Sequence, residues 1–515
     1  MKPHLMFAED DSTPRPPVNA PDLIADLELA TLCEAMARGD EGLLSAARAA
    51  LLDPLTDPAE IRYRQQVLAD CLRHPGAVRE LHRVADEAIA AERKLLRGAF
   101  TGQSAPLLNR SVRVLEVFGD FLHRLRAIAE RQVDTFSSSA FTRLFREILA
   151  ELDDDYLRTM DAVLEQLRFE HGIVVSARLG DGNKGVDFVL RKPPGKGRKS
   201  PGHRALKRSN LSFTVTGRDE SDYRSLTALR GRALSGIANA TAQSADHVRD
   251  FFLALRDELG FYLGCVNLAE TLSELGVPTC WPEPRAPGGN VLSARELHEP
   301  CLALRLRRGV VGSDLDADGR SLVLITGPNQ GGKSTFLRGA GIAHLMMQAG
   351  MFVAARQFTA STVTGVFTHY KREEDASMAS GKLDEELARM STIADHVTPG
   401  SLLLCNESFA STNEREGADI AAEIVRALTD SGVRIVFVTH LYELARRMHT
   451  EAPERCVFLR ATRRDDGERT FRISPGEPTP TAHGADLYVK IFGTAPVRST
   501  QDEGPDEPDR APPPW

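Results

Sequence analysis

Gly327-Pro328-Asn329-Gln330-Gly331-Gly332-Lys333-Ser334 matches the phosphate-binding loop pattern Gly-x-x-x-x-Gly-Lys-Ser without a gap. The apolar run SLVLI at 321–325 predicts a buried strand before it, and the sequence from Thr335 onward predicts a helix after it. In such a strand–loop–helix, backbone N–H groups surround the phosphates and the helix N-terminus adds partial positive charge. Lys333 would contact the β- and γ-phosphates, and the Ser334 hydroxyl would bind Mg²⁺. The pattern predicts a nucleoside triphosphate site at residues 327–335; the alternative is a glycine-rich turn that binds no ligand.

Two further apolar runs end in polar residues that suit the same chemistry. SLLLC at 401–405 precedes Asn406 and Glu407, and VRIVFV at 433–438 precedes Thr439 and His440. Enzymes with this loop usually end the first of these strands in Asp-Glu: the Asp holds the metal shell and the Glu polarises the attacking water. Asn406 can still accept a hydrogen bond from a metal-bound water, but it lacks the negative charge, so we expect weaker Mg²⁺ binding and weaker activity.

Glu407 is therefore the expected catalytic residue, and Ser334, Asn406 and Glu407 are the expected metal-site residues, acting partly through water. His440 lies where a histidine can contact the γ-phosphate and sense its loss. The alternative for His440 is an ordinary histidine at the end of a strand.

Five segments together resemble the ATPase domain of the MutS family, the DNA mismatch-repair ATPases and their relatives. These segments are GPNQGGKST (327–335), ASGKLDEELARM (379–390), LLLCNES (402–408), STNEREG (411–417) and THLYEL (439–444). The resemblance implies an ABC-type ATPase that uses ATP and Mg²⁺. It also implies a homodimer in which each nucleotide is held between two subunits.

The resemblance places Ser380, Gly381 and Lys382 in the signature segment that reaches across such a dimer. The family's Arg-Ser-Thr is replaced here by Lys382-Leu383-Asp384, so the residue that performs this role is left open. TAHGADL at 481–487 resembles the family's Ser-x-Gly segment, which packs across the dimer.

The first half of the chain resembles the helical core domain of the same family. LDPLTD at 52–57 and IRYRQ at 61–65 resemble its start, and 265–300 resembles its junction with the ATPase domain. The family's mismatch-reading and connector domains would precede this core, where the chain has only residues 1–20. Phe7-Ala8-Glu9 imitates the family's mismatch-wedging Phe-x-Glu, and we interpret it as coincidence. We therefore expect a role in DNA repair or recombination without true mismatch recognition.

Composition favours a cytoplasmic protein that contacts nucleic acid only locally. Seven cysteines are scattered without a CxxC pair, which argues against a disulfide framework or a zinc site. No apolar run approaches membrane-spanning length, and the N-terminal sequence lacks the apolar core of a secretion signal. A net charge of −8 is unlike that of a general nucleic-acid binder, so any DNA contact must come from a local patch.

Residues 191–208 form such a patch, because they contain many basic residues and no acidic one. The basic residues are Arg191, Lys192, Lys196, Arg198, Lys199, Arg204, Lys207 and Arg208. Strand-like segments at 172–191 and 209–216 flank it, so we expect a small β insertion at about 171–216 with a basic loop. The MutS family carries a comparable clamp that holds the DNA backbone; phosphate contacts of this kind carry no sequence information. The alternative is a solvated loop.

The expected fold is an α/β P-loop ATPase domain of the ABC type, preceded by a mainly α-helical region. Helical spacing of apolar residues is clear before residue 170 and again at 217–275. The expected organisation is a disordered leader (1–20), a helical core and lever with the clamp-like insertion (21–315), the ATPase domain (316–495) and a disordered Pro-rich acidic tail (496–515).

Two functions from different classes remain open. The first is an ATP hydrolase that clamps duplex or branched DNA as a dimer, largely independently of sequence. The second is a nucleotide-gated scaffold that binds ATP, hydrolyses little and meets DNA only incidentally. Glu407, His440 and the basic patch favour the first, whereas Asn406 and the altered signature segment favour the second. A transporter ATPase fits less well, because the long helical half has no place in it.

Overall fold

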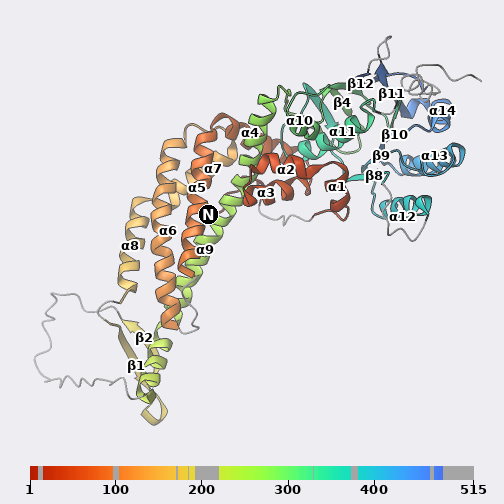
Figure 1. The fold of residues 1–515 in the computed structure, drawn as a ribbon. Coiled ribbons are helices and arrows are strands. Elements are labelled where there is room, and N and C mark those ends of the chain that lie inside the picture. Colours follow the sequence, from red (N-terminus) through yellow and green to blue (C-terminus); the bar gives the residue numbers. More distant parts are fainter. Residues whose placement is uncertain are drawn as a thin grey trace, which may run out of the picture.

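The computed structural model of the 515-residue chain describes residues 1–9, 16–96, 104–169, 172–183, 185–191, 220–328, 330–372, 381–463 and 469–478. The molecule is elongated: a long helical arm ends in a β hairpin, and a sheet-containing part lies at the opposite end (Figure 1). Among the helices in these ranges, none is both long and apolar enough to cross a lipid bilayer.

Helices form the arm and its base. They are α1 (Ala20–Asp26), α2 (Leu29–Ala37), α3 (Glu41–Leu51), α4 (Pro58–Arg73), α5 (Pro75–Leu96), α6 (Ser104–Gln132), α7 (Ser139–Glu151), α8 (Asp154–Leu167) and α9 (Glu220–Glu274). The 55-residue α9 runs the length of the arm and packs against α5 and α6 (Figure 1). Polar side chains start several of these helices; Asp40, Asp57, Ser138 and Asp153 each accept a backbone N–H of the first turn.

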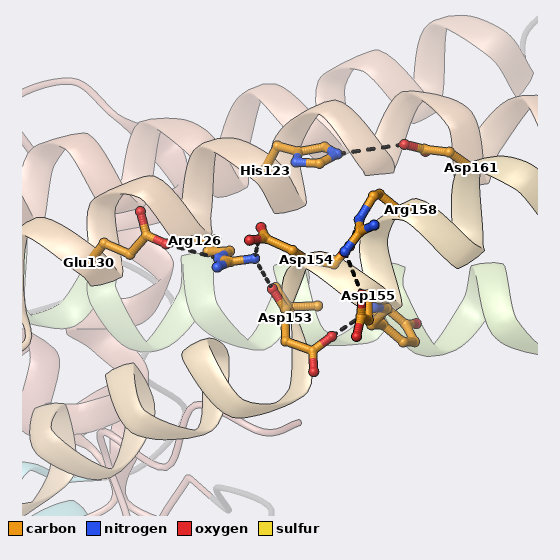
Figure 2. A network of polar contacts seen from close by, with 10 residues as sticks. His123, Arg126, Glu130, Asp153, Asp154, Asp155, Arg158 and Asp161 are labelled. Atoms are coloured by element: carbon orange, nitrogen blue, oxygen red, sulfur yellow. Dashed lines mark hydrogen bonds and ion pairs between the residues drawn. The ribbon is translucent and has the colours of Figure 1, made fainter.

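Helix α8 lies along α6 and is held there by a surface network centred on Arg126 (Figure 2). Its guanidinium pairs with Glu130 on its own helix at 3.0 Å and with Asp154 at 2.5 Å, and it donates to the Leu152 carbonyl at 3.0 Å. His123 and Asp161 face each other further along, at 3.8 Å. Exposed ion pairs contribute little each, so the network orients α8 more than it stabilises it.

A β hairpin forms the far end of the arm. Strands β1 (Val174–Leu179) and β2 (Gly185–Arg191) pair antiparallel, with the short 3-10 helix η1 (Asp181–Asn183) between them. The Arg232 guanidinium on α9 lies 5.4 Å from the centre of the Phe188 ring and fixes β2 to the arm. The strand-like segment expected at 172–191 is thus two strands; the one expected at 209–216 lies outside the described residues.

The sheet-containing part is built on six strands in the order β12-β11-β6-β10-β9-β8. All neighbours in it are parallel except β12, which pairs antiparallel with β11. Its elements are β6 (Leu322–Thr326), α11 (Lys333–Gln348), β8 (Val366–Tyr370), α12 (Lys382–Ala394), β9 (Leu402–Asn406), α13 (Glu414–Asp430), β10 (Arg434–Val438), α14 (Tyr442–Glu451), η2 (Pro453–Arg455), β11 (Cys456–Arg463) and β12 (Arg469–Pro475). The central strands are continuous apolar runs because both faces of a parallel sheet are covered, and the three strands expected from sequence are each confirmed to within one residue.

A second, smaller sheet has the order β3-β7-β4-β5. Its strands are β3 (Glu283–Arg285), β4 (Leu292–Leu297), β5 (Ser313–Asp316) and β7 (Gln357–Ser361), and α10 (Pro300–Leu306) lies between β4 and β5. The boundary expected between residues 315 and 316 falls inside β5, and β7 comes from beyond α11. The region expected to be helical core and lever (21–315) therefore ends in strands β3, β4 and β5. These strands share a sheet with β7, which belongs to the expected ATPase domain.

Residues 1–9 pack against the base of the arm, so the expectation of a disordered leader is wrong for them. Leu5 is fully buried, and its carbonyl accepts a hydrogen bond from Tyr262 at 2.6 Å. The Met6 carbonyl accepts from Arg64 at 2.9 Å, and the Phe7 ring lies 4.5 Å from the same guanidinium. These partners lie on α4 and α9, too far along the chain to leave a local sequence signal.

The C-terminal end of α11 joins the sheet to the helical part. The buried Gln348 amide donates to the carbonyls of Leu55 (2.8 Å) and Val363 (2.9 Å) and accepts from the Val363 N–H (3.1 Å). Arg64 also donates to the carbonyl of Ala349, at 3.4 Å. Helix α11 therefore begins at the glycine-rich loop and ends against the helical part.

Candidate functional site

The residues singled out in the sequence meet at one edge of the large sheet. Strands β6, β9 and β10 are parallel, so their carboxyl ends lie at the same edge. The loop from 327 to 332 leaves β6 there, Asn406 ends β9 and Glu407 follows it, and His440 follows β10. Crevices at the carboxyl ends of parallel strands are the usual ligand sites of open α/β sheets.

The glycines of the loop are required by close packing against β11 and β12. Gly327 and Gly332 have φ of +118° and +93°, in the range that favours glycine. A Cβ atom at Gly331 would lie 2.7 Å from the Ala461 Cβ, and one at Gly332 would lie 3.0 Å from the Phe471 carbonyl oxygen. The backbone at these glycines thus packs closely against β11 and β12, directly before the N-terminus of α11, where no side-chain cap occupies the free N–H groups.

Lys333 folds back over this turn. Its Nζ donates to the carbonyls of Gly327 (2.9 Å) and Pro328 (3.0 Å), and the residue is 4% exposed. Burial lowers the pKa of Lys333, and the carboxylate of Glu407 opposes that shift. A buried ammonium thus lies within the loop, near the carboxylate expected to be catalytic.

Ser334 joins the first turn of α11 to the end of β9. Its hydroxyl donates to Asn406 Oδ1 at 2.8 Å. Hydroxyl, amide and carboxylate oxygens from Ser334, Asn406 and Glu407 are hard ligands of the kind Mg²⁺ prefers. Over the described ranges no group of three or more His, Cys, Asp or Glu side chains is gathered for a metal. The donor set therefore fits a Mg²⁺ ion held partly by water and by the phosphates of a ligand.

Glu407 follows β9 in an unusual backbone conformation, with φ of +54°. Its N–H donates to the Val438 carbonyl at 2.8 Å, which fixes it between the ends of β9 and β10. His440 is exposed at the end of β10, and the Thr439 hydroxyl before it accepts the Leu441 N–H at 2.9 Å.

A cavity of about 500 Å³ lies beside the loop. It is lined by Leu297, His298, Glu299, Leu302, Leu306, Arg308, Gly309, Val310, Val311, Ser313, Gly332, Thr335, Phe336, Gly339 and Phe471. His298 holds the Val310 carbonyl through Nδ1 at 2.9 Å, and its buried Nε2 has no hydrogen-bond partner. The walls come from α10, α11, β12 and the segment before β5, so only the fold brings them together; the valine pair between Gly309 and Gly312 is the one local signal.

Two family models match the chain. The MutS2 N-terminal domain matches residues 56–275, and MutS domain V matches residues 323–481. The chain belongs to the MutS family. The second match contains the loop, Asn406, Glu407 and His440; the first contains most of the arm, including the β1–β2 hairpin.

Curated relatives from the MutS family are similar over part of their length. DNA mismatch repair protein MutS of Chloroflexus aurantiacus is 29% identical over 268 residues, which cover 47% of this chain and 28% of that protein. The protein of the same name from Methanococcoides burtonii is 26% identical over 281 residues (54% and 31%), and that from Porphyromonas gingivalis is 31% identical over 190 residues (36% and 21%). The matches thus span less than a third of these relatives.

Several residues to which the sequence assigns MutS-type roles lie outside the part of the chain that the structure describes. Asn329 and Ser380 lie outside the described residues, as do residues 192–208 of the basic patch and the 481–487 segment. Gly381 is the N-cap of α12 and Lys382 its first residue, both exposed. Arg191 ends β2 and donates to Ser176 at 2.9 Å.

Proposed function

We propose that this chain is a MutS-type ATPase that binds ATP with Mg²⁺ at residues 327–335 and hydrolyses it. The observation that carries the proposal is the meeting of Lys333, the Ser334–Asn406 hydrogen bond and Glu407 at one sheet edge. In this proposal the loop N–H groups and Lys333 bind the phosphates, and Ser334, Asn406 and Glu407 hold Mg²⁺ and its water. Mg²⁺ would supply charge neutralisation at the phosphates.

Glu407 is proposed to orient the attacking water, and His440 to face the γ-phosphate. The cavity beside the loop would receive the nucleoside: at about 500 Å³ it has the size of a small-molecule site, and its lining is mainly apolar with a few polar groups. Thr335 lines it from α11 and lies next to the proposed phosphate site.

The arm is proposed to hold DNA at its hairpin end, with residues 21–315 as core and lever and 316–495 as the ATPase domain. Arg178 on β1 is highly exposed at that end, and Arg191 leads into the basic patch. The decisive experiment measures steady-state ATP hydrolysis with and without duplex or branched DNA. We expect hydrolysis that DNA changes severalfold.

A second candidate function is a nucleotide-gated scaffold with little hydrolysis, and Asn406 favours it, because this residue removes one charge beside the metal. ATP binding with negligible turnover, unaffected by DNA, would establish this second function instead.

We also propose a homodimer that closes around ATP, with Gly381, Lys382 and the neighbouring Ser380 contributing across it. Sedimentation in ATP at tens of micromolar should show a dimer. A strict monomer with full hydrolysis would exclude shared sites.

A further inference from the structure

The loop that carries Glu407 leaves β9 through a strained backbone. Glu407 and Phe409 have φ of +54° and +63°, values that residues other than glycine seldom adopt. Ser408 lies between them and is fully buried. Such conformations persist only where the surroundings hold them. The contacts of Ser408 therefore control the direction in which the Glu407 side chain leaves the sheet.

His369, near the end of β8, holds Ser408. Its Nδ1 lies 2.6 Å from Ser408 Oγ, which is also 2.8 Å from the His369 carbonyl oxygen. Its Nε2 lies 3.0 Å from the Glu386 carbonyl of α12. The imidazole also stacks on Phe409, with ring centres 5.4 Å apart and planes at 23°. One buried ring thus contacts both the loop of Glu407 and α12.

The hydrogen-bond partners define the protonation of this ring. A carbonyl oxygen can only accept, so Nε2 carries the hydrogen that points at Glu386. Burial, with a smaller contribution from Arg389, lowers the pKa of His369 to about 4, so the ring is neutral at pH 7. Nδ1 is then an acceptor, and the single hydroxyl hydrogen of Ser408 is shared between two acceptors of His369, Nδ1 and the carbonyl oxygen. His369 is a fixed connector here, and its charge does not change in the physiological range.

A second contact joins α12 to the other end of the same loop. The Ser411 hydroxyl donates to Glu386 Oε1 at 3.0 Å, and Glu386 is 6% exposed. Glu386 therefore contacts His369 through its backbone and Ser411 through its side chain. Helix α12 begins at Lys382, directly after the segment proposed to act across the dimer. Through these contacts α12 is joined to residues on both sides of Phe409, Ser408 and Ser411.

We propose that His369 and Ser408 are positioning residues for hydrolysis, which hold Glu407 in its working orientation only while α12 is seated against the end of β8. This inference rests on the proposed function. It gives the closure of a second subunit a physical route to the catalytic carboxylate: pressure on the start of α12 reaches Glu407 through Glu386, His369 and Ser408. ATP binding itself, which uses the loop at 327–335, does not require this connection.

The test is Ser408→Ala, which removes only the hydroxyl. We expect kcat to fall by about 10-fold to 100-fold, as for a small misplacement of a reacting group, with ATP affinity within about twofold of wild type. The matched control is Ser401→Ala at the opposite end of β9. Ser401 is equally buried, and its hydroxyl contacts Thr364 at 3.0 Å and the Thr398 N–H at 3.1 Å, away from Glu407. Ser401→Ala should keep the wild-type kcat, even if it lowers the midpoint of thermal unfolding as much as Ser408→Ala does.

A double variant separates positioning from a general loss of structure. If Ser408 acts through Glu407, Ser408→Ala should lower kcat no further once Glu407→Gln is present. Two results would overturn this inference and leave the proposed function standing. One is a wild-type kcat in Ser408→Ala. The other is a loss of kcat on adding Ser408→Ala to Glu407→Gln that equals the loss it causes in the wild-type protein. Absence of ATP hydrolysis by the wild-type protein would overturn the proposed function and this inference together.

Discussion

At the residue scale, Lys333 is the cation on which the proposed nucleotide site depends. It is buried among loop carbonyls, so a triphosphate would compete with Gly327 and Pro328 for an ammonium that is already in place. Lys333→Ala should weaken ATP binding at least about 100-fold, equal to about 2.7 kcal/mol. Titration calorimetry with ATP measures this, and Lys94→Ala at the exposed end of α5 is the control. Retention of affinity within about threefold, or about 0.7 kcal/mol, would refute the assignment of the loop.

Glu407 and Asn406 are neighbours with different expected roles, so their substitutions should have opposite effects. Glu407→Gln should bind ATP but hydrolyse it at least about 100-fold more slowly, because the group that orients water is lost. Asn406→Asp should hydrolyse as fast as wild type or faster: an Asp oxygen can still accept from Ser334 and restores a charge beside Mg²⁺. Single-turnover hydrolysis in Mg²⁺ distinguishes the two. Normal turnover by Glu407→Gln would place the catalytic role on another residue.

The sequence predicts those parts of the candidate site that are built from consecutive residues, and it misses contacts between residues far apart in the chain. The loop at 327–335 is a continuous pattern between its own strand and helix, so the sequence predicts both flanking elements, and α11 begins only two residues earlier than expected, at Lys333. The cavity beside it was not predicted, because Val310 and Phe471 are 161 positions apart in sequence and no periodicity relates them. The His369–Ser408 contact spans 39 positions and was missed for the same reason.

At the scale of elements, the N-terminal segment is joined to α9 by one half-buried carboxylate, that of Glu258. Glu258 accepts the N–H groups of Leu5 and Met6, the latter at 3.1 Å. Burial raises the pKa of Glu258 above its ordinary 4.5, an effect that these two hydrogen bonds and Arg64 only partly oppose. A raised pKa in the folded state means that Glu258 contributes stability at low pH, and that this contribution is lost as pH rises through the folded-state pKa.

Glu258→Gln removes this pH dependence and keeps an oxygen that can accept both N–H groups. At pH 7 the variant should therefore unfold at the same temperature as wild type or higher, and the difference should shrink as pH falls toward 4.5. Thermal unfolding followed by circular dichroism across this range measures it, with the exposed Glu165→Gln as control. A variant that is less stable than wild type at pH 7 and gains relative stability at low pH would mean that folding lowers the pKa of Glu258, which contradicts the prediction.

At the scale of the whole molecule, α9 joins the base of the arm to its hairpin end. Its 55 residues span about 80 Å at 1.5 Å per residue. One end of the helix is at the base, near α4 and the N-terminal segment, and the other is beside the β1–β2 hairpin, far from the large sheet (Figure 1). Helix α11 also ends against this base, at Leu55 and Arg64, so this one helix joins the glycine-rich loop to the base of the arm.

If the hairpin end and residues 191–208 hold DNA, binding should depend strongly on salt and little on sequence. Each phosphate contact on duplex DNA contributes about −0.9 to the slope of log affinity against log salt. With about four phosphates neutralised per subunit, the slope should be about −3.6. Replacing Arg198, Lys199, Lys207 and Arg208 by Ala should flatten the slope and weaken all duplexes alike. The matched control replaces four exposed basic residues elsewhere on the arm, Arg83, Arg93, Lys94 and Arg113, and should keep the slope.

Fluorescence anisotropy with homoduplex, mismatched and branched DNA at several salt concentrations measures both effects. A single mismatch should add little, because Phe7, the one residue that imitates a mismatch wedge, is held against Arg64 at the base of the arm and not at its hairpin end. An unchanged slope in the quadruple variant would make the basic patch a solvated surface. Strong selectivity for one mismatch would instead assign a reading role to another part of the chain, since phosphate contacts alone cannot distinguish one base pair from another.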